Sequence, residues 1–462
     1  MQIPVMNGIY TDKVSDIRTS YPVNLVPVPK ENGIANGYLR PAEGVELLAD
    51  TDGLDRGGIN WDGVQYRVIG VNLVRVSASG VVTTIGNVGG SGQCTFAYSF
   101  DYLAIASGGS LYLYNGSELK KITDSDIGNV IDVIWVDGYF MTTDGSYLIV
   151  TELNDPFAVN PLKYGSAEID PDPVLAIEKV HNEVFAVGRY TIEVFDNVGG
   201  DLFPFQRIEG AMIPRGTLGT FTCCKMDGVL FFVGSGRSEQ VAIYAAGSAS
   251  SQKISTREID QILSNYTESV LSKCLLESRV LDGHQWLYFH LPDQTIVYDL
   301  AASVASGSPV WFILKTNGQY CVKNFVWCDD QWTAGHVSEN KLGVMTDKVS
   351  DHFGTRVDWE FGTTIMYNQG FGALFHRIEL VSLTGNIDFN KKPTISTQYS
   401  VDGETWSTEK FINAGGYANR AKRLVWLQQG RMLNWRIQRF KGNSDARISI
   451  IRLEAHIEPL AV

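Results

Sequence analysis

Acidic pairs are the first residues in this sequence whose types and spacing could perform chemistry. Asp170 and Asp172 flank one proline, and Asp329 and Asp330 are adjacent. A glycosidase needs two carboxylates across a pocket, one of them with a raised pKa. These pairs instead stand before an expected strand and in an expected hairpin, where Asp is common. We assign no catalytic pair, and a propeller glycosidase acting on polysaccharide stays open as an alternative function.

Histidine and cysteine could supply a metal site, but their spacing does not favour one. His284 and His290 lie six residues apart on one expected hairpin, no Cys-x-x-Cys occurs, and no His lies at ligand spacing from a Cys pair. We expect structural histidines and reduced, buried thiols made in a cytoplasm, with a zinc cluster as the weaker alternative. The cysteines are Cys94, Cys223, Cys224, Cys274, Cys321 and Cys328.

The sequence also lacks the motifs that bind phosphate or activate a nucleophile. No Walker, Gly-x-Ser-x-Gly or dinucleotide signature occurs, and the pairs Gly89-Gly90 and Gly199-Gly200 do not open helices. The sequence therefore predicts no catalytic, cofactor-binding or metal-binding residue, and it implies no cofactor.

The hairpin from Ser400 to Trp406, which contains Asp402-Gly403, resembles the Asp-box of sialidase propellers and a hairpin of sugar-binding sandwiches. Its physics is that of a turn, in which Asp caps, Gly bends and Trp pins the hairpin to the core. We favour this structural role. A sugar-binding module is the other interpretation that rests on it.

One stretch concentrates positive charge, with no acidic residue before Asp445. Three interpretations are open: a solvated sandwich face, a docking surface for an acidic neighbour such as the propeller of an adjacent subunit, and contact with DNA phosphates. The third is weakest, because the interleaved Trp426 and Trp435 also fit core alternation. The cations are Arg420, Lys422, Arg423, Arg431, Arg436, Arg439 and Lys441.

A repeated phrase must position these residues: an apolar strand, a tight turn that often reads Asp-Gly, and a second strand. Asp and above all Gly tolerate the positive φ of a two-residue hairpin. The turns fall at residues 62, 101, 137, 182, 227, 282 and 329, in steps of 39, 36, 45, 45, 55 and 47. Such units are typical of β-propeller blades. We expect an all-β protein in which residues 51–350 form a propeller of six or seven irregular blades, with a β-sandwich array as the alternative.

A helix interrupts the longest step. Ser255-Thr-Arg-Glu258 reads as a capping box, and apolar residues follow at helical spacing from Ile259 to Leu271. The pattern predicts a helical insertion between blades, near residues 255–273.

Residues 1–50 do not fit the repeat. Three prolines between Tyr21 and Pro29 exclude a helix there. We expect an extended N-terminal arm that lies across its own domain or reaches a partner.

The last residues, 351–462, lose the repeat spacing but keep strand-like segments. Leu433, Trp435 and Ile437 alternate with Asn434, Arg436 and Gln438, which predicts that the first set is buried and the second faces water. The pattern favours a separate antiparallel β-sandwich or barrel.

Composition and charge exclude further classes. The 462 residues are 44% hydrophobic, 11% aromatic and 19% charged, which excludes a disordered chain and suggests extensive core or interface. No secretory signal or membrane-spanning segment is expected. Residues 1–350 hold 24 Lys+Arg and 40 Asp+Glu (net −16), whereas residues 351–462 hold 14 and 11 (net +3), which sums to −13. This acidity argues against simple adhesion to DNA or anionic lipid.

An ordered set of segments resembles the packaged DNA stabilization proteins, also called tail nozzle or hub proteins, of short-tailed bacteriophages infecting enterobacteria. The resemblance covers nearly the whole chain and is specific as a set, since no single motif is diagnostic. The segments are Val23–Lys30 with Gly37–Arg40, Val184–Phe195, Ile259–Glu268, His290–Pro292 with Val297–Asp299, Pro309–Gly318 and Val401–Gly403.

The resemblance implies a structural virion component of the tail, synthesised in the host cytoplasm, and not an enzyme. It implies a homohexameric ring that attaches below the portal–adaptor ring after packaging and retains the packaged double-stranded DNA. The ring would also serve as the conduit for DNA ejection and as the platform for the tail needle and tailspikes. An acidic bore would let DNA pass without sequence-specific binding.

Overall fold

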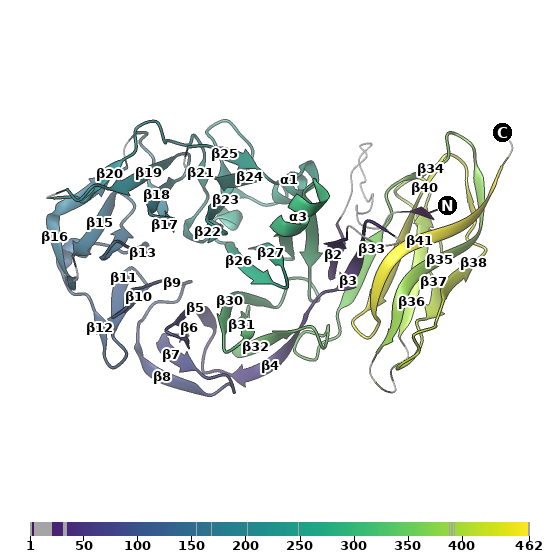
Figure 1. Ribbon diagram of the computed structural model, residues 1–462, viewed down its shortest axis with the longest axis horizontal. Coiled ribbons are helices and arrows are strands. Elements are labelled where there is room, and N and C mark those ends of the chain that lie inside the picture. The colour runs from purple at the N-terminus through teal and green to yellow at the C-terminus, as the bar shows by residue number, and fades with distance from the viewer. Residues whose placement is uncertain are drawn as a thin grey trace.

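The computed structural model describes residues 2–3, 21–30, 35–153, 155–167, 169–200, 202–247, 249–387, 389, 391 and 393–460. Figure 1 shows a ring of sheets beside a second domain that contains the last strands of the chain. Within the described ranges the chain is nearly all β, as the sequence predicted, and a propeller is joined to a C-terminal sandwich.

Seven antiparallel sheets form the blades of the propeller in the described part of the chain. The first blade contains β5 (Asp55–Trp61), β6 (Val64–Ile69), β7 (Asn72–Val76) and β8 (Val82–Asn87). The second contains β9 (Thr95–Tyr98), β10 (Leu103–Ser107), β11 (Ser110–Tyr114) and β12 (Leu119–Lys121). The third contains β13 (Asp132–Val136), β14 (Tyr139–Thr143), β15 (Tyr147–Glu152) and β16 (Asp155–Ser166).

The remaining blades follow the same order along the chain. They are β17 (Val174–Val180), β18 (Glu183–Gly188), β19 (Ile192–Asn197) and β20 (Phe205–Arg207); β21 (Gly216–Thr217), β22 (Cys223–Met226), β23 (Val229–Ser235), β24 (Ala242–Ala246) and β25 (Ser251–Lys253); β26 (Leu275–Leu281), β27 (His284–His290), β28 (Thr295–Asp299) and β29 (Val310–Leu314); and β30 (Val322–Cys328), β31 (Gln331–His336) and β32 (Lys341–Thr346) with β4 (Gly44–Asp50).

The repeated turns connect the innermost strand of each blade to the second strand. At four of these turns Asp has φ near +50° and the following Gly is also left-handed, as the hairpin prediction requires. These are Asp62, Asp137, Asp227 and Asp282. The turn chemistry that revealed the repeat therefore also sets the geometry of the blades.

The ring closes through the N-terminal segment. Strand β4 precedes the first blade in sequence but pairs antiparallel with β32, in register from Thr346↔Gly44 to Lys341↔Asp50. The seventh blade thus takes its outer strand from the beginning of the chain, and the ring cannot open without breaking this ladder.

The segment expected to be an N-terminal arm is divided between the two domains in its described part. Strands β2 (Leu25–Pro29) and β3 (Gly37–Pro41) form a hairpin, and β3 joins β41 of the sandwich. The segment is extended, as the prolines require, and β4 completes the propeller. It is a structural connection rather than a free arm.

Two packed sheets form the C-terminal domain. One contains β2, β3, β41 (Arg447–Pro459), β35 (Ala373–Asn386) and β38 (Leu424–Leu427), with β1 (Gln2–Ile3) and β39 (Arg431–Met432) attached. The other contains β33 (Asp358–Gly362), β40 (Trp435–Asn443), β36 (Thr394–Ser400) and β37 (Lys410–Asn413), with β34 (Met366–Tyr367) attached.

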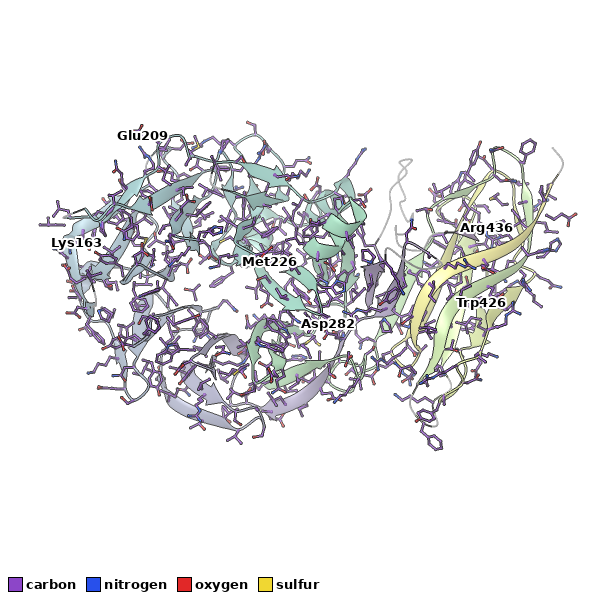
Figure 2. All side chains as sticks on the ribbon, in the orientation of Figure 1. Lys163, Glu209, Met226, Asp282, Trp426 and Arg436 are labelled. Atoms are coloured by element: carbon purple, nitrogen blue, oxygen red, sulfur yellow. The ribbon has the colours of Figure 1, made fainter. Side chains whose placement is uncertain are left out.

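The alternation predicted for residues 433–438 holds at Ile437, which is buried, and at Asn434, which is exposed, but it is wrong at three other positions. Leu433 is 64% exposed, whereas Arg436 and Gln438 are fully buried. Arg436 lies between the rings of Phe375 and Tyr399, and Figure 2 places it within the sandwich. A planar guanidinium can stack on aromatic faces inside a core, which a simple polar–apolar pattern does not anticipate.

The helical insertion is shorter than predicted and is capped by a different residue. Helices α1 (Arg257–Leu263) and α2 (Glu268–Leu271) replace one long helix, and the Thr256 hydroxyl, not that of Ser255, accepts from the Ile259 amide. Ser255 instead donates to Asp260. A further helix, α3 (Leu300–Ser306), was not expected; short 3-10 turns cover Ser125–Ile127 and Thr220–Thr222.

The closure of the ring can be tested at Gly343 on β32. A Cβ atom there would lie 2.4 Å from a Val45 methyl and 2.8 Å from the Phe353 ring. We expect Gly343→Ala to lower the free energy of unfolding by about 1–3 kcal/mol, because the added methyl group overpacks the ladder. Chemical denaturation measures this, with Gly247→Ala as the control, since no atom lies within 4 Å of its Cβ position. Equal stability of the two variants would contradict the closure.

Candidate functional site at the domain junction

Of the acidic pairs considered for glycoside hydrolysis, the first is engaged in structural contacts and the second lies in a turn. Asp170 forms an ion pair with Arg237, and Asp172 accepts from the amides of Tyr190 (2.6 Å) and Thr191 (2.9 Å). Asp329 and Asp330, both with positive φ, form a hairpin turn. The structure does not bring either pair together as an acid and a base across a pocket.

The two hairpin histidines each hold a carboxylate in place. His284 Nδ1 lies 2.5 Å from Asp299, which also accepts from Trp286 and caps helix α3. His290 Nε2 lies 2.7 Å from Glu277. Both rings therefore serve the packing of the sixth blade.

All six cysteines are free thiols, and five of them are buried. Burial raises the pKa of Cys274 to about 11 and that of Cys321 to about 12, so these thiols stay protonated and unreactive at neutral pH. Among the described residues, no group of three or more His, Cys, Asp or Glu side chains could hold a metal ion. No helix in the described ranges is long and apolar enough to cross a membrane.

The Asp402 hairpin forms a capped turn. Asp402 accepts from the amides of Glu404 (2.9 Å) and Thr405 (2.8 Å), and bonds from the Thr405 hydroxyl and amide hold its pKa well below its usual range. Trp406 stacks against Arg439, 3.9 Å from the ring centre. Every contact of this carboxylate serves the turn.

The basic stretch does not form one surface. Arg436 is buried, Arg423 is paired with Glu379, and Arg439 and Lys441 both lie near Glu360. Arg420, Lys422 and Arg431 remain exposed. These cations are close together in the sequence, but in the folded domain they lie on different faces.

The segment Pro22–Asn24 joins the two domains through its backbone. The Val23 amide donates to Glu360 O of β33 in the sandwich (2.8 Å), and Glu360 donates back. On the other side, the Asn24 amide donates to Ile313 O of β29 in the propeller (2.8 Å). One short stretch of chain therefore hydrogen-bonds to a strand of each domain.

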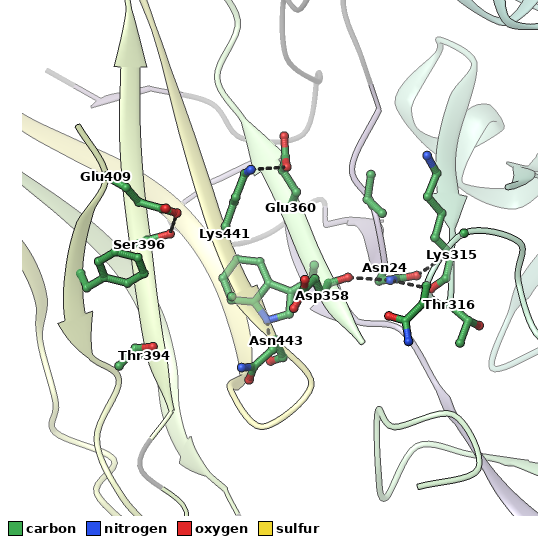
Figure 3. Close-up of a pocket in the computed structure, with 16 residues that line it drawn as sticks. Asn24, Lys315, Thr316, Asp358, Glu360, Thr394, Ser396, Glu409, Lys441 and Asn443 are labelled. Atoms are coloured by element: carbon green, nitrogen blue, oxygen red, sulfur yellow. Dashed lines mark hydrogen bonds and ion pairs between the residues drawn. The ribbon is translucent and has the colours of Figure 1, made fainter. Parts of the chain in front are cut away.

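The Asn24 side chain repeats this bridge. Its Nδ2 donates to Lys315 O in the propeller (2.9 Å) and to Asp358 O in the sandwich (2.6 Å), while its Oδ1 accepts from the Lys315 amide (2.9 Å). Asn24 is 6% exposed and has φ of +54°, which Asn tolerates better than most residues. These three bonds, which we call the Asn24 clamp, satisfy backbone groups of both domains (Figure 3).

A second set of contacts holds the segment in which the chain passes from the propeller, after β32, back to the sandwich at β33. Arg447 of β41 donates to Ser350 Oγ (3.1 Å) and to the carbonyls of Asp347 and Lys348. Ser350 in turn donates to Ala42 O (3.0 Å). The segment between β32 and β33 is therefore bonded to the segment between β3 and β4, in which the chain first passes from the sandwich to the propeller. Both chain crossings between the domains are therefore fixed by side-chain bonds.

A buried ion pair fixes the segment between β3 and β4 to the propeller. Glu43 pairs with Arg279, whose guanidinium is fully buried among the rings of Trp286, Phe325 and Trp332. An unpaired charge at this depth would be strongly destabilising. Residue 43 is thus fixed to the sixth blade before β4 enters the seventh.

A groove of about 500 Å³ lies at this junction, with the Asn24 clamp in one wall. Figure 3 shows Ser396 and Glu409 on the sandwich side and Lys315 and Thr316 on the propeller side, with Lys441, Asp358 and Asn24 between them. Ser396 donates to Glu409, Lys441 pairs with Glu360 at 3.4 Å, and Trp359 donates to Asn443 O. The groove is lined by polar side chains. Its carboxylates bond to neighbouring donors, as Glu409 and Glu360 do, or lie beside the domain junction, as Asp358 does.

Carboxylates at the centre of the propeller were not anticipated from the sequence. Asp132 accepts from the amides of Val133 and Ile177, so it links the third and fourth blades, and burial raises its pKa to about 6. Burial, together with the charge of Asp132, raises the pKa of Glu178 to about 8, while Lys225 opposes the shift. Glu277 similarly accepts from the Asn324 and Phe325 amides of the next blade.

The clamp residues also escaped sequence analysis. Asn24 bonds to partners 291 and 334 positions away, so no local pattern could identify it. Arg447 stands in an expected strand, where a lone Arg indicates only an exposed position. The signal that the sequence does carry is an Asn, a residue that tolerates positive φ, directly before the proline-rich strand in Val23–Pro29.

Together these features define an all-β class of protein, in which a seven-bladed propeller is fixed to a C-terminal sandwich by segments from the beginning of the chain. The chain belongs to the Bacteriophage P22 Gp10 family. The family model described as its beta-propeller matches residues 1–350, and the model described as its beta-sandwich matches residues 358–458.

A curated relative and two solved structures are similar to the chain. The tail hub protein gp10 of Salmonella phage P22 is 27% identical over 459 residues, which cover 93% of this chain and 94% of the relative. The Pan2 WD40 domain of Neurospora crassa has a TM-score of 0.43 and 10% identity, over 65% of this chain and 95% of that one. PorZ of Porphyromonas gingivalis has a TM-score of 0.41 and 10% identity, over 80% and 46%.

The Asn24 clamp can be tested by removing its bonds without straining its backbone. Asn24→Gly keeps the left-handed conformation but loses all three side-chain bonds, and we expect a loss of about 2–4 kcal/mol in the free energy of unfolding. Asn24→Asp should cost more at pH 7, since a carboxylate would face two carbonyl oxygens. Asn317→Ala, an exposed change in the same groove, is the control. Unaltered stability of Asn24→Gly in chemical denaturation would refute the clamp.

Glu178 gives a prediction about pH. Its folded pKa of about 8 exceeds the ordinary 4.5, so the folded state holds this proton more tightly and its contribution to stability falls as pH rises from about 4.5 to 8. Glu178→Gln should therefore gain stability over the natural chain as pH rises, by at least about 1 kcal/mol between pH 5 and pH 9. Unfolding midpoints at both pH values measure this, with Glu183→Gln as the control. A gain independent of pH would contradict it.

Proposed function

We propose that this protein is the tail hub, or nozzle, of a short-tailed bacteriophage. In this role it closes the portal channel after genome packaging, retains the packaged DNA, and provides the conduit for DNA ejection. It also carries the tail needle and tailspikes. It is located in the tail of the virion and is synthesised in the cytoplasm of the host.

The observation that carries the proposal is the match over both domains in the same order. The similarity to the tail hub protein gp10 of Salmonella phage P22 covers 93% of this chain and 94% of that protein, so it is not confined to one common fold. Propellers alone host many unrelated functions, and fold is a weak guide to function. The combination of a propeller with this particular sandwich is much more specific.

The domain junction supports a mechanical role. A protein that closes a channel against packed DNA must transmit force between its attachment points without bending. The Asn24 clamp, the Arg447 contacts and the Glu43–Arg279 pair hold the two domains through buried or partly buried bonds. A joint built from several such contacts opens only if they break together.

The charge distribution supports DNA as a passenger rather than a ligand. The arm and propeller region carries a net charge of −16, and negative surfaces repel phosphates. We propose a homohexameric ring attached to the portal–adaptor ring, through which the duplex slides without sequence-specific contact.

A non-enzymatic role is part of the proposal. Asp170 is held by Arg237, Asp172 is held by backbone amides, Asp329 and Asp330 lie exposed in a hairpin turn, and Asp402 is held in its turn. A glycosidase would need a carboxyl kept free across a pocket. Polysaccharide hydrolysis or binding is therefore the less favoured alternative.

Reconstitution tests the proposal. Phage heads assembled without this protein should release their DNA, and addition of the full chain should restore DNA protected from nuclease. Electron microscopy should show the added protein as a sixfold ring at the portal exit. The matched control is the chain with Asn24→Asp, which should protect less DNA. Heads that retain DNA equally without the protein, or a chain that never binds the portal–adaptor complex, would refute the proposal.

A further inference from the structure

One end of the sandwich exposes apolar side chains, from the last part of strand β35 and from two loops, in the part of the chain that the structure describes. Leu383 is 66% exposed, Phe389 77% and Tyr417 65%, and the two rings contact each other edge-on at 6.1 Å. The Ala418 amide donates to Gly385 O (3.1 Å), which holds the two loops together. Clustered exposed apolar side chains on a soluble protein commonly mark an interaction surface.

Two cations stand beside these rings. Arg420 and Lys422 are exposed, and neither forms an ion pair with a described residue, unlike Arg423, which is paired with Glu379. We call Leu383, Phe389, Tyr417, Arg420 and Lys422 the sandwich tip. It combines exposed aromatic area with positive charge that no acidic residue of the described chain pairs, so it fits a partner that is acidic and apolar at once.

The propeller carries a surface of that description, at the hairpin turns of the seventh, first and second blades. Phe100 is 97% exposed and Trp327 is 43% exposed. Around them stand carboxylates that are all exposed and that form no ion pair with a described residue. We call these residues the turn patch: Asp62, Phe100, Asp101, Trp327, Asp329 and Asp330.

Hydrogen bonds between neighbouring blades place these three turns side by side. Trp61 Nε1 donates to Ser99 O (3.0 Å), which links the first turn to the second. Asn60 Nδ2 donates to Trp327 O (2.8 Å), and the Cys328 thiol contacts Gly63 O (3.4 Å), which link the first turn to the seventh. The four carboxylates and two aromatic rings therefore form one continuous patch.

We propose that the sandwich tip of one copy docks on the turn patch of the next copy. The two surfaces are complementary in charge, and each offers exposed rings that the other can cover. The contact joins different surfaces of identical chains, so it is heterologous, and repetition of it builds a ring where the rotation closes. This inference rests on the proposed function, because it assigns the lateral contact of the proposed ring.

Charge reversal at the tip is the first test. The double variant Arg420→Glu/Lys422→Glu changes exposed side chains, so it should unfold at the same temperature as the natural chain. We expect at least a tenfold rise in the concentration needed for self-association, measured by sedimentation velocity of the full chain with portal–adaptor complexes as nuclei. Arg431→Glu, an exposed cation at the other end of the sandwich, is the matched control and should assemble normally.

Reversal at the patch gives the reciprocal test. Asp62→Lys/Asp101→Lys should also prevent assembly. Mixing the two defective proteins should restore assembly, since each natural tip meets a natural patch and each reversed, acidic tip meets a patch that carries the two introduced lysines, so the two variants alternate around the ring. Combining all four substitutions in one chain should restore the ring, because the charges are again opposite.

The outcomes separate this inference from the proposed function. Tip and patch variants that assemble like the natural chain would overturn the inference while leaving the hub role intact, as would failure of the fourfold variant to recover while both parent variants remain folded. A natural chain that does not bind the portal–adaptor complex would instead overturn the proposed function.

Discussion

Partly buried backbone groups that belong to two domains find their partners at one place, the side chain of Asn24, and this constraint organises the molecule. The Lys315 amide and carbonyl lie in the propeller, and the Asp358 carbonyl lies in the sandwich. Water is largely excluded at Asn24, so each group would carry a desolvation penalty if it were left unpaired. One asparagine side chain satisfies all three, and it can do so only while the domains keep their observed orientation.

The rest of the N-terminal segment follows from that joint. With Val23 and Asn24 fixed between β33 and β29, the hairpin of β2 and β3 extends a sandwich sheet, and Glu43 reaches Arg279. Strand β4 is then delivered to β32, where it closes the seventh blade. Closure of the ring and fixation of the sandwich are thus consequences of the same fifty residues, so the chain couples the stability of one domain to that of the other.

The blades were predictable from the sequence, because their turns obey a local rule. The turn conformation depends on two adjacent residues, Asp and Gly, that tolerate positive φ, and Asp62 and Asp227 both adopt it. The site was not predictable, because Asn24 and Arg447 act over separations of about a hundred residues or more. The alternation around Arg436 failed for another reason: two aromatic faces and Gln438 make a buried guanidinium tolerable, and pairwise polarity does not encode such a pocket. Burial nevertheless lowers the pKa of Arg436 to about 9.

The central claim is that the propeller and the sandwich form one rigid body. Pulsed electron paramagnetic resonance tests this most directly, with spin labels on the full chain at Ser117→Cys in the propeller and Glu404→Cys in the sandwich, both exposed positions. A rigid junction predicts one narrow distance distribution that stays unchanged when the protein assembles. A broad distribution, or two populations in the free protein, would contradict it.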